Sequence, residues 1–523
     1  MKRFLSLPLA LCLALSLIAG TAWASGEASG SASGLSAQIE LTEYGPVDMT
    51  RWQYNETNDV YWQVGISYCE TPADASYENL GIYVPGAYLT GTPNDDGTYT
   101  CAVNETGTVA GFTAATAPIV FPVNTPGHSA QSAPTGYVSG SAKYTDAGFI
   151  YVSAGCRGKD VGCPAGVVDL KAVIRYIRAN LDVLPGCGDR IVPFGMSGGG
   201  SQTAVLGVTG DSDLYAPYLE AIGAADTSDA VAAAMCWCPI TGLDSADEGH
   251  EWSMGVTRTD LNAEFQAYSD ALAAAYAGYV NAMGFTDEYG NLLTLEPSSD
   301  GVYQAGSYYD YVKRVIEESL EHYLADNGMT EDGSAQAYID SLNADGVWVA
   351  YDAAANTVEI ASIADFSLRC KKATKPVAAF DKLEKGGHEL FNTGDGDTVH
   401  FDAMLYEIIR GTEYEAAFDE DFALLDSVGN TVADRLLLFS PLSYLLPANE
   451  AYGTASVAEH WRIRSGIAQS DTPLTSELNL ALALQMYGVD VDFETVWGLG
   501  HTQAERTGDS DANFIAWVQG LWL

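Results

Sequence analysis

Positive charge is scarce in this chain, in which 24 Lys and Arg residues face 69 Asp and Glu residues and the formal net charge is −45. Because such a chain repels polyanions, we expect neither nucleic acid nor an anionic membrane surface among its partners. The acidic balance favours solubility and repulsion between copies, or tolerance of a salty or acidic exterior. Hydrophobic residues still make up 47% of the sequence, which is enough for a large core.

Long apolar runs are absent after the first residues. There, two basic residues precede an apolar stretch at 4–18, and Ala22-Trp23-Ala24 follows it, which is the order of a secretory signal peptide spanning 1–24. Cys12 lies in the middle of the stretch rather than behind a small residue, so a lipid anchor is the less favoured alternative. Gly, Ser and Ala dominate residues 25–37, which predicts a flexible linker. We therefore expect a secreted bacterial protein, extracellular or on the exterior of the cell envelope, without membrane insertion.

Cysteine is sparse as well, and eight of the nine cysteines lie beyond the predicted cleavage site. An even number in an exported chain permits disulfides, and Cys156 with Cys163 would close a short loop, with buried free thiols as the equal alternative. Cys236-Trp237-Cys238 has no His or Cys cluster at ligand spacing around it. A phosphate-binding loop is also absent. We expect no metal and no cofactor.

One serine stands between glycines in Gly195-Met196-Ser197-Gly198-Gly199. An apolar run at 190–194 predicts a strand before it, helical periodicity marks 170–181, and 201–206 favours a second helix. This order of helix, strand, serine and helix is typical of a nucleophile elbow, where small neighbours let a substrate carbonyl approach the backbone. Pro193 conflicts with the strand because its missing N–H would break a ladder bond, yet the strand remains the better prediction.

Two blocks of alternating strand and helix patterns frame a different middle section. Further strands are predicted at Val60 to Tyr68, Leu80 to Val84, Ile119 to Val123, Phe149 to Ser153, Val231 to Cys238, Trp461 to Gly466 and Val491 to Trp497, and further helices at 260–282, 307–325, 476–487 and 512–523. We therefore expect the α/β class, an α/β-hydrolase fold whose mostly parallel central sheet is flanked by helices. Its core comprises residues 38–242 and 457–523, and residues 243–456 form a large, mainly helical lid or cap insertion.

An acyl-transfer serine needs a histidine base and an acid that holds this base in the right tautomer. The chain order in this fold is serine, acid, histidine. His501 follows the last predicted strand with glycines before it, so it is the expected base for Ser197. Asp471 follows the preceding strand and is the expected acid, with a helix cap as its alternative role. Asp244 and Asp247 form a second candidate pair.

Backbone N–H groups are expected to hold the oxyanion. One belongs to Gly198, and another to the loop Asn124-Thr125-Pro126-Gly127-His128, in which Gly127 lets the substrate oxygen come close. An ordinary Pro-Gly turn is the alternative reading of this loop. His250 and His388 lie in the predicted lid and are candidates for contact with substrate.

Several longer motifs accompany the elbow. They are Asp169-Leu170-Lys171-Ala172-Val173-Ile174-Arg175-Tyr176 before it, then Cys238-Pro239-Ile240-Thr241, Leu243-Asp244-Ser245-Ala246-Asp247, Glu251-Trp252 and Phe380-Asp381. Together they make the chain resemble the bacterial tannases, α/β-hydrolases related in fold to feruloyl esterases. The similarity runs from about Trp52 to the end of the chain. It implies hydrolysis of a phenolic acyl ester, galloyl or hydroxycinnamoyl, through a covalent acyl-serine.

The same resemblance makes Ser197 the nucleophile and His501 the base. The family's acid lies in a loop resembling Gly-Thr-x-Asp-x-Asp-Thr, where the first Asp completes the triad and the second contacts phenolic hydroxyls. This chain has Gln469 at the first of these positions and Asp471 at the second. An amide cannot stabilise the imidazolium as a carboxylate does. Either Asp471 takes the acid's role, or another carboxylate serves, or the activity is weak.

A Lys and a Glu from the family's lid also grip the galloyl ring, and Lys375 and Glu389 stand near the matching stretch of this chain. A small aromatic ester is therefore the expected partner. Two alternatives remain open. One is a peptidase or acetyl esterase on the same fold, and the other is an exported binding protein with a degenerate triad, for which Gln469 is the motivating residue.

Overall fold

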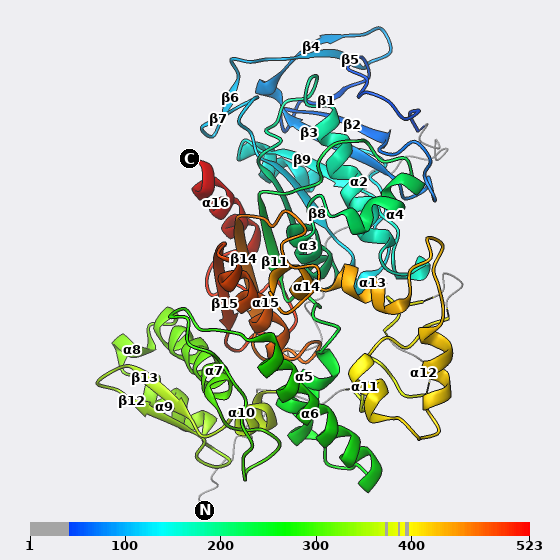
Figure 1. Ribbon diagram of the computed structural model, residues 1–523. Helices are drawn as coiled ribbons and strands as arrows, with labels where there is room; N and C mark the ends of the chain where they lie inside the picture. The colour runs from blue at the N-terminus through cyan, green and yellow to red at the C-terminus, as the bar shows by residue number, and fades with distance from the viewer. Residues whose placement is uncertain (1–40, 372–374, 385–387, 393–396) are drawn as a thin grey trace, which may run out of the picture.

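A nine-stranded sheet forms the centre of the molecule. The computed structural model describes residues 41–371, 375–384, 388–392 and 397–523, so the predicted signal peptide and linker lie outside the described residues. The order across the sheet is β1-β2-β3-β9-β8-β10-β11-β14-β15 (Figure 1). These strands are β1 (Gln53–Asn55), β2 (Val60–Ser67), β3 (Asn79–Pro85), β8 (Ile119–Val123), β9 (Ile150–Ala154), β10 (Ile191–Met196), β11 (Ala233–Trp237), β14 (His460–Gly466) and β15 (Asp490–Val496).

Six of these strands, from β9 across to β15, are parallel to one another, and β1, β2 and β3 are antiparallel to their neighbours. Every residue of β8 and β11 is buried, because a parallel sheet is covered by helices on both faces and its strands are apolar throughout. Pro193 pairs with Phe121 of β8 but precedes the ladder to β11, which begins at Phe194. The proline therefore leaves that second ladder intact, and the predicted mostly parallel sheet is confirmed.

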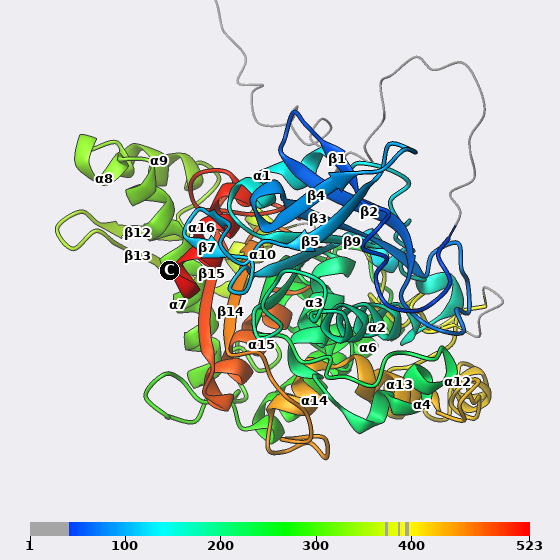
Figure 2. The same cartoon turned by 90° about the horizontal axis from the view of Figure 1, so that it is seen from above.

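Helices cover both faces of the sheet. Those of the core are α1 (Ala142–Asp146), α2 (Ala165–Ala179), α3 (Gly198–Val208), α4 (Ala216–Ala221), α15 (Leu474–Tyr487) and α16 (Ser510–Trp522). In Figure 2, α2, α3 and α15 lie on one side of the sheet, and α1 and α16 on the other. On that second side, the Phe514 ring of α16 packs against Phe194 of β10, with the ring centroids 4.4 Å apart. Two small hairpins lie between β3 and β8 in the chain. They are formed by β4 (Leu89–Pro93) with β5 (Tyr99–Val103) and by β6 (Thr108–Val109) with β7 (Phe112–Thr113).

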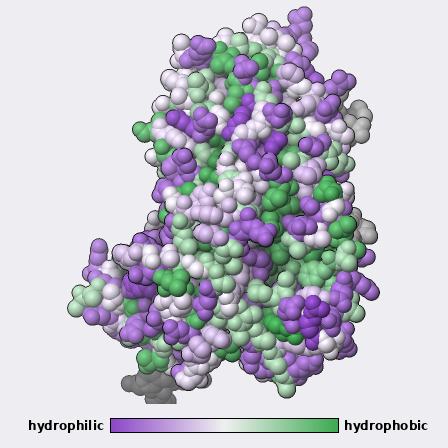
Figure 3. All heavy atoms as spheres, in the orientation of Figure 1, coloured by the Kyte–Doolittle hydropathy of each residue, from purple (hydrophilic) through white to green (hydrophobic). Residues whose placement is uncertain are grey.

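A helical insertion joins β11 to β14. It contains α5 (Ala246–Met254), α6 (Ala263–Met283), α7 (Ser307–Asp326), α8 (Met329–Asp332), α9 (Ala335–Leu342), α10 (Ile363–Cys370), α11 (Ala403–Ile408), α12 (Glu415–Phe422), α13 (Val432–Phe439) and α14 (Pro441–Leu445), with one hairpin of β12 (Val349–Asp352) and β13 (Thr357–Ile360). In Figure 1 most of it lies below the sheet. Figure 3 shows hydrophilic and apolar side chains interspersed on this face, with apolar groups gathered near the middle, where the insertion meets the core. The boundaries at 243 and 456 stay predictions.

Two further features bear on the expectations from sequence. All eight cysteines of the described residues are free thiols, Cys156 and Cys163 among them, so the short loop is not closed by a disulfide. Among the described residues, no helix combines the length and the apolar character needed to cross a bilayer.

Candidate active site

Ser197 lies on the sharp turn between β10 and α3. Its backbone angles are φ 61° and ψ −125°, a strained combination for a residue with a side chain, and its N–H donates to the Trp237 carbonyl oxygen at 3.0 Å. The glycines around it are required by close contacts of backbone with backbone. A Cβ on Gly199 would lie 1.9 Å from the Val123 carbonyl oxygen, and one on Gly195 would lie 2.6 Å from the Gly199 carbonyl group. The turn has the geometry of a nucleophile elbow.

The structure brings His501 to Ser197. The histidine lies in the loop after β15, and its Nε2 is 2.8 Å from Ser197 Oγ. Burial lowers the pKa of His501, the charge of Asp471 raises it, and Lys375 lowers it further. Because a base must be neutral to accept a proton, this depressed pKa keeps the imidazole ready to receive the hydroxyl proton of Ser197.

Gln469 holds the other side of the imidazole. It lies just beyond β14, and its Oε1 is 2.6 Å from His501 Nδ1. Its Nε2 donates to Ser465 Oγ at 2.9 Å, to Thr472 Oγ1 at 3.1 Å and to the carboxylate of Glu477. Sequence reasoning recognised Gln469 as a departure from the acid's position. It missed Glu477, which it treated only as part of a helix.

Asp471 is close to the imidazole without bonding to it. Its Oδ2 lies 3.8 Å from His501 Nδ1, beyond hydrogen-bond range, and its side chain is 53% exposed. The other candidate acids are engaged elsewhere. Asp244 accepts from Ser440 Oγ at 2.9 Å, and Asp247 accepts from two backbone N–H groups at 2.7 and 2.9 Å. Asp471 as the acid stays a prediction, with Gln469 in the position of direct contact.

The loop after β8 packs directly on the elbow. A Cβ on Gly198 would lie 2.4 Å from both the His128 nitrogen and the Thr125 carbonyl oxygen. Gly198 opens α3, where the first amides of a helix have no acceptor within the helix. Gly127 has φ 57°, and a Cβ there would meet nothing within 4 Å. The two glycines predicted for the oxyanion hole therefore lie on adjoining segments, and the space beside Gly127 is open.

Of the described residues predicted to contact substrate, only Lys375 has a hydrogen bond to the loop that carries Gln469 and Asp471. Lys375 lies at the site, where its Nζ donates to the Asp471 carbonyl oxygen at 2.6 Å. Glu389 has a 62% exposed side chain and pairs with Lys159. His388 packs edge-on against His128, with ring centroids 5.2 Å apart, and burial lowers its pKa to about 4. His250 is buried beside Glu251, 3.6 Å away.

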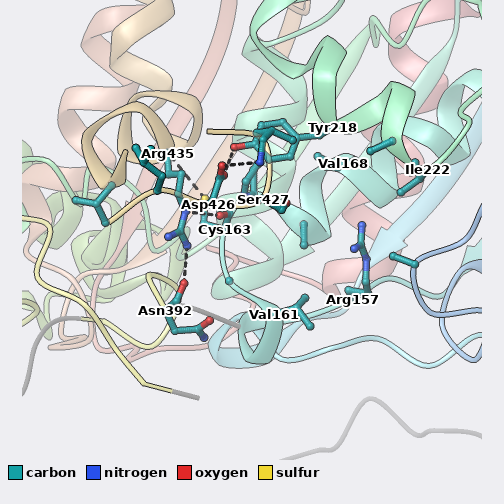
Figure 4. Close-up of a pocket in the computed structure, with 18 of the residues that line it drawn as sticks. Arg157, Val161, Cys163, Val168, Tyr218, Ile222, Asn392, Asp426, Ser427 and Arg435 are labelled. Carbon is teal, nitrogen blue, oxygen red and sulfur yellow. Dashed lines mark hydrogen bonds between the residues drawn. The ribbon is translucent and has the colours of Figure 1, made fainter. Parts of the chain in front are cut away.

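A cavity of about 540 Å³ lies apart from these residues. It is enclosed by α2, α4, α13 and the loop at 424–428, and its lining includes Arg157, Tyr218 and Arg435 (Figure 4). None of Ser197, Gln469 and His501 lines it. Within the described ranges, no group of three or more His, Cys, Asp or Glu side chains is arranged to hold a metal ion.

The fold and the site define an α/β-hydrolase-like protein with a serine, a histidine and an amide in line. No protein-family model and no curated protein matches the chain. Several solved structures are similar to this chain. One is tannin acyl hydrolase from Lactobacillus plantarum, which is 26% identical and has a TM-score of 0.70, with 92% of this chain and 99% of that chain covered. Fusobacterium nucleatum tannase is 27% identical, covering 89% and 95%, with a TM-score of 0.69. A tannin acyl hydrolase solved in complex with ethyl gallate is 28% identical, covering 89% and 94%, with a TM-score of 0.69.

The structural neighbours are thus tannases, similar over almost the whole of both chains, and the resemblance noted in the sequence is confirmed. This likeness supports an ester hydrolase for phenolic substrates. A further neighbour was solved with 3,4-dihydroxybenzoate, so the ligands of these relatives are small aromatic molecules.

Proposed function

We propose that this protein is an exported serine ester hydrolase that cleaves a phenolic acyl ester through an acyl-serine intermediate. The observation that carries the proposal is the 2.8 Å contact between Ser197 Oγ and His501 Nε2 on a strained elbow. A hydroxyl beside a neutral imidazole is activated as a nucleophile because the imidazole accepts its proton during attack. The likeness to tannases supports the proposed substrate class, an ester with a phenolic acyl group.

The proposed chemistry has two halves. Ser197 Oγ attacks the carbonyl carbon of the ester while its proton passes to His501 Nε2, and the resulting oxyanion faces the N–H of Gly198 and the loop at Gly127. The bond to the alcohol then breaks, and His501 returns the proton to the leaving oxygen. Water repeats the sequence: it gives a proton to His501, attacks the acyl carbon and releases the acid, and Ser197 regains its proton.

The proposed phenolic preference rests on the polar groups around the imidazole. Asp471 exposes a carboxylate 3.8 Å from His501 Nδ1, and Lys375 is anchored to the same loop. A carboxylate accepts hydrogen bonds from ring hydroxyls, and a site with such groups rejects esters that lack the hydroxyls because its own polar groups are left unpaired. Asp471 thus has two proposed tasks, attraction of the imidazolium and contact with the phenol.

Covalent labelling tests the serine mechanism. A fluorescent alkylphosphonate should label the wild-type chain stoichiometrically, and Ser197→Ala should remain unlabelled at unchanged thermal stability. The same preparations are then assayed with methyl gallate, methyl ferulate and a short-chain acetyl ester. Faster turnover of the two phenolic esters supports the proposed substrate class. Equal rates on all three esters would refute phenolic specificity, and preferred cleavage of the acetyl ester would indicate the acetyl esterase alternative.

A binding protein is the second candidate, and Gln469 at the acid's position is the observation that favours it. A protein of this kind would bind methyl gallate in calorimetry, hydrolyse none of the three esters and leave the phosphonate unreacted. Labelling of the wild-type chain at Ser197 would exclude it.

Export is proposed from the sequence alone, because residues 1–24 have the order of a secretory signal. Expression of the full chain in a secreting bacterial host should yield a product whose intact mass lacks these 24 residues. Recovery of the uncleaved chain in the cytoplasm would contradict this part of the proposal.

A further inference from the structure

We infer that Glu477 is a positioning residue for the proposed ester hydrolysis: by accepting a hydrogen bond from Gln469, it turns the amide so that an oxygen, not an N–H, faces His501. Glu477 lies in the first turn of α15 and is fully buried. It touches neither Ser197 nor His501 in any hydrogen bond, and it acts through Gln469.

The surroundings of the Gln469 amide group define its orientation. One end of the amide faces His501 Nδ1, and the other faces three oxygens, those of Ser465, Thr472 and Glu477. A carboxylate oxygen only accepts hydrogen bonds, so the end that faces Glu477 must be the NH2 group. A flipped amide would place its oxygen against the carboxylate and lose that bond.

The two hydroxyl groups agree with this orientation. Thr472 Oγ1 donates its hydrogen to Glu477 Oε1 at 2.6 Å, and Ser465 Oγ directs its own toward Cys238 Sγ at 3.8 Å. Both hydroxyl oxygens therefore present lone pairs to Gln469 Nε2, whose two hydrogens are shared among these oxygens and Glu477 Oε1. Glu477 contributes twice, because it accepts from the amide directly and also takes the Thr472 hydrogen that would otherwise be free to donate to the amide.

The orientation decides the tautomer of the base. Gln469 Oε1 is an acceptor, so His501 Nδ1 carries the hydrogen, and the lone pair of Nε2 is left to accept the proton of Ser197. With the amide reversed, its NH2 would face Nδ1, the ring hydrogen would move to Nε2, and the base could not accept the serine proton. An amide in the acid's position is thus compatible with catalysis only while something fixes its direction.

The two oxygens of Glu477 have different surroundings. Burial raises the pKa of this carboxyl, and its Oε2 has no hydrogen-bond partner among the described residues. Lys371 is also buried, and its Nζ donates to the backbone carbonyl oxygen of Gln469 at 3.0 Å. Its positive charge lowers the pKa of Glu477 and so opposes part of the effect of burial. Oε1 accepts the hydrogen bonds from Gln469 Nε2 and Thr472 Oγ1. It keeps both bonds when a proton is bound to Oε2.

A swap of the two side chains tests the inference. Glu477→Gln introduces an NH2 group where only an acceptor stood, so the Gln469 amide can reverse and kcat should fall at least tenfold, toward the roughly 10⁴-fold loss caused by an amide that imposes the wrong tautomer. In the double variant Gln469→Glu with Glu477→Gln, a carboxylate faces His501 and an amide lies behind it, so kcat should return to at least the wild-type value. Glu317→Gln in α7 is the matched control, because Glu317 is also a buried acceptor, bonded to the Ile360 N–H at 3.0 Å, and lies outside the site.

Nuclear magnetic resonance of ¹⁵N-histidine in the same variants reads the tautomer without substrate. The His501 ring, assigned by the signal missing from His501→Asn, should carry its hydrogen on Nδ1 in the wild type and lose this preference in Glu477→Gln. An unchanged tautomer in Glu477→Gln would overturn the inference, and so would a loss of kcat that the double variant fails to restore. If the wild type hydrolyses no ester, the proposed function fails, while the tautomer measurement still decides the role of Glu477.

Discussion

Gly198→Ala gives the sharpest test of the proposed oxyanion site, because its effect follows from two distances. The added methyl group would lie 2.4 Å from the His128 nitrogen and 2.4 Å from the Thr125 carbonyl oxygen, whereas ordinary contact begins near 3.4 Å. Both neighbours are backbone atoms and cannot rotate away. The loop carrying Gly127 must therefore retreat by about 1 Å, a misplacement that costs about 100-fold in rate when it affects groups aligned for the reaction.

We expect kcat of Gly198→Ala on the preferred ester to fall about 10²- to 10³-fold, the loss that follows removal of one oxyanion donor. KM should change little, because the interaction is made mainly in the transition state. The methyl group should also lower the free energy of unfolding by about 1–3 kcal/mol, as other overpacked sites do. Steady-state kinetics and urea denaturation measure the two effects separately.

Gly278→Ala is the matched control, since Gly278 lies within α6 and a Cβ there meets nothing within 4 Å. It should leave kcat unchanged and stabilise the fold by about 0.5–1 kcal/mol, because alanine favours a helix interior over glycine. A folded Gly198→Ala variant with kcat within twofold of wild type would refute the assignment of this loop to the oxyanion site.

Two further predictions concern charge. Because Asp471 raises the pKa of His501 and Lys375 lowers it, Asp471→Asn should move the acid limb of phosphonate inactivation to lower pH and Lys375→Met should move it to higher pH. In the wild type, the midpoint of this acid limb should lie below the usual histidine pKa, since burial lowers the pKa of His501. The change caused by Asp471→Asn should shrink in high salt, because the Asp471 side chain is half exposed and its charge is screened. Shifts of the same sign in both variants would refute the electrostatic account. Arg157→Met should lower the free energy of unfolding by about 3–5 kcal/mol in urea denaturation, because it strips fully buried Asp169 of a bidentate partner, and a loss under 1 kcal/mol would contradict this.

Much of the fold could be predicted because burial on both faces leaves a strong pattern. The strand predicted at Ile119 to Val123 matches β8, which is an apolar run. The strand predicted at Trp461 to Gly466 matches β14 to within one residue, and here Trp461 and Ile463 alternate with arginines, which is the period of a strand. The hairpin of β12 and β13 was missed. Its strands are four residues each and lie in a region of helical periodicity, where so short an alternation carries little signal.

The candidate site could be predicted in part. Glycines marked Ser197, because backbone segments that approach within contact distance exclude every larger residue, and chain order then singled out His501. Gln469 was visible as a departure from a motif. Its consequence was not, because the direction of an amide depends on which side chains surround its far end, and Glu477 reaches that end from the next helix. Three-dimensional contacts of this kind leave no periodic trace in the sequence.

In the usual triad one carboxylate both orients the imidazole and balances its positive charge. In the mechanism proposed for this chain, the two tasks are divided. Gln469 orients the ring through a neutral hydrogen bond of 2.6 Å, and the nearest carboxylate, Asp471, stands 3.8 Å away with half of its side chain in solvent. A screened charge at that distance stabilises the imidazolium less than a buried, hydrogen-bonded one would. In the proposed mechanism, turnover therefore depends more heavily on the preorganised backbone around Gly198 and on the amide direction that we assign to Glu477 than it would with an aspartate in place of Gln469.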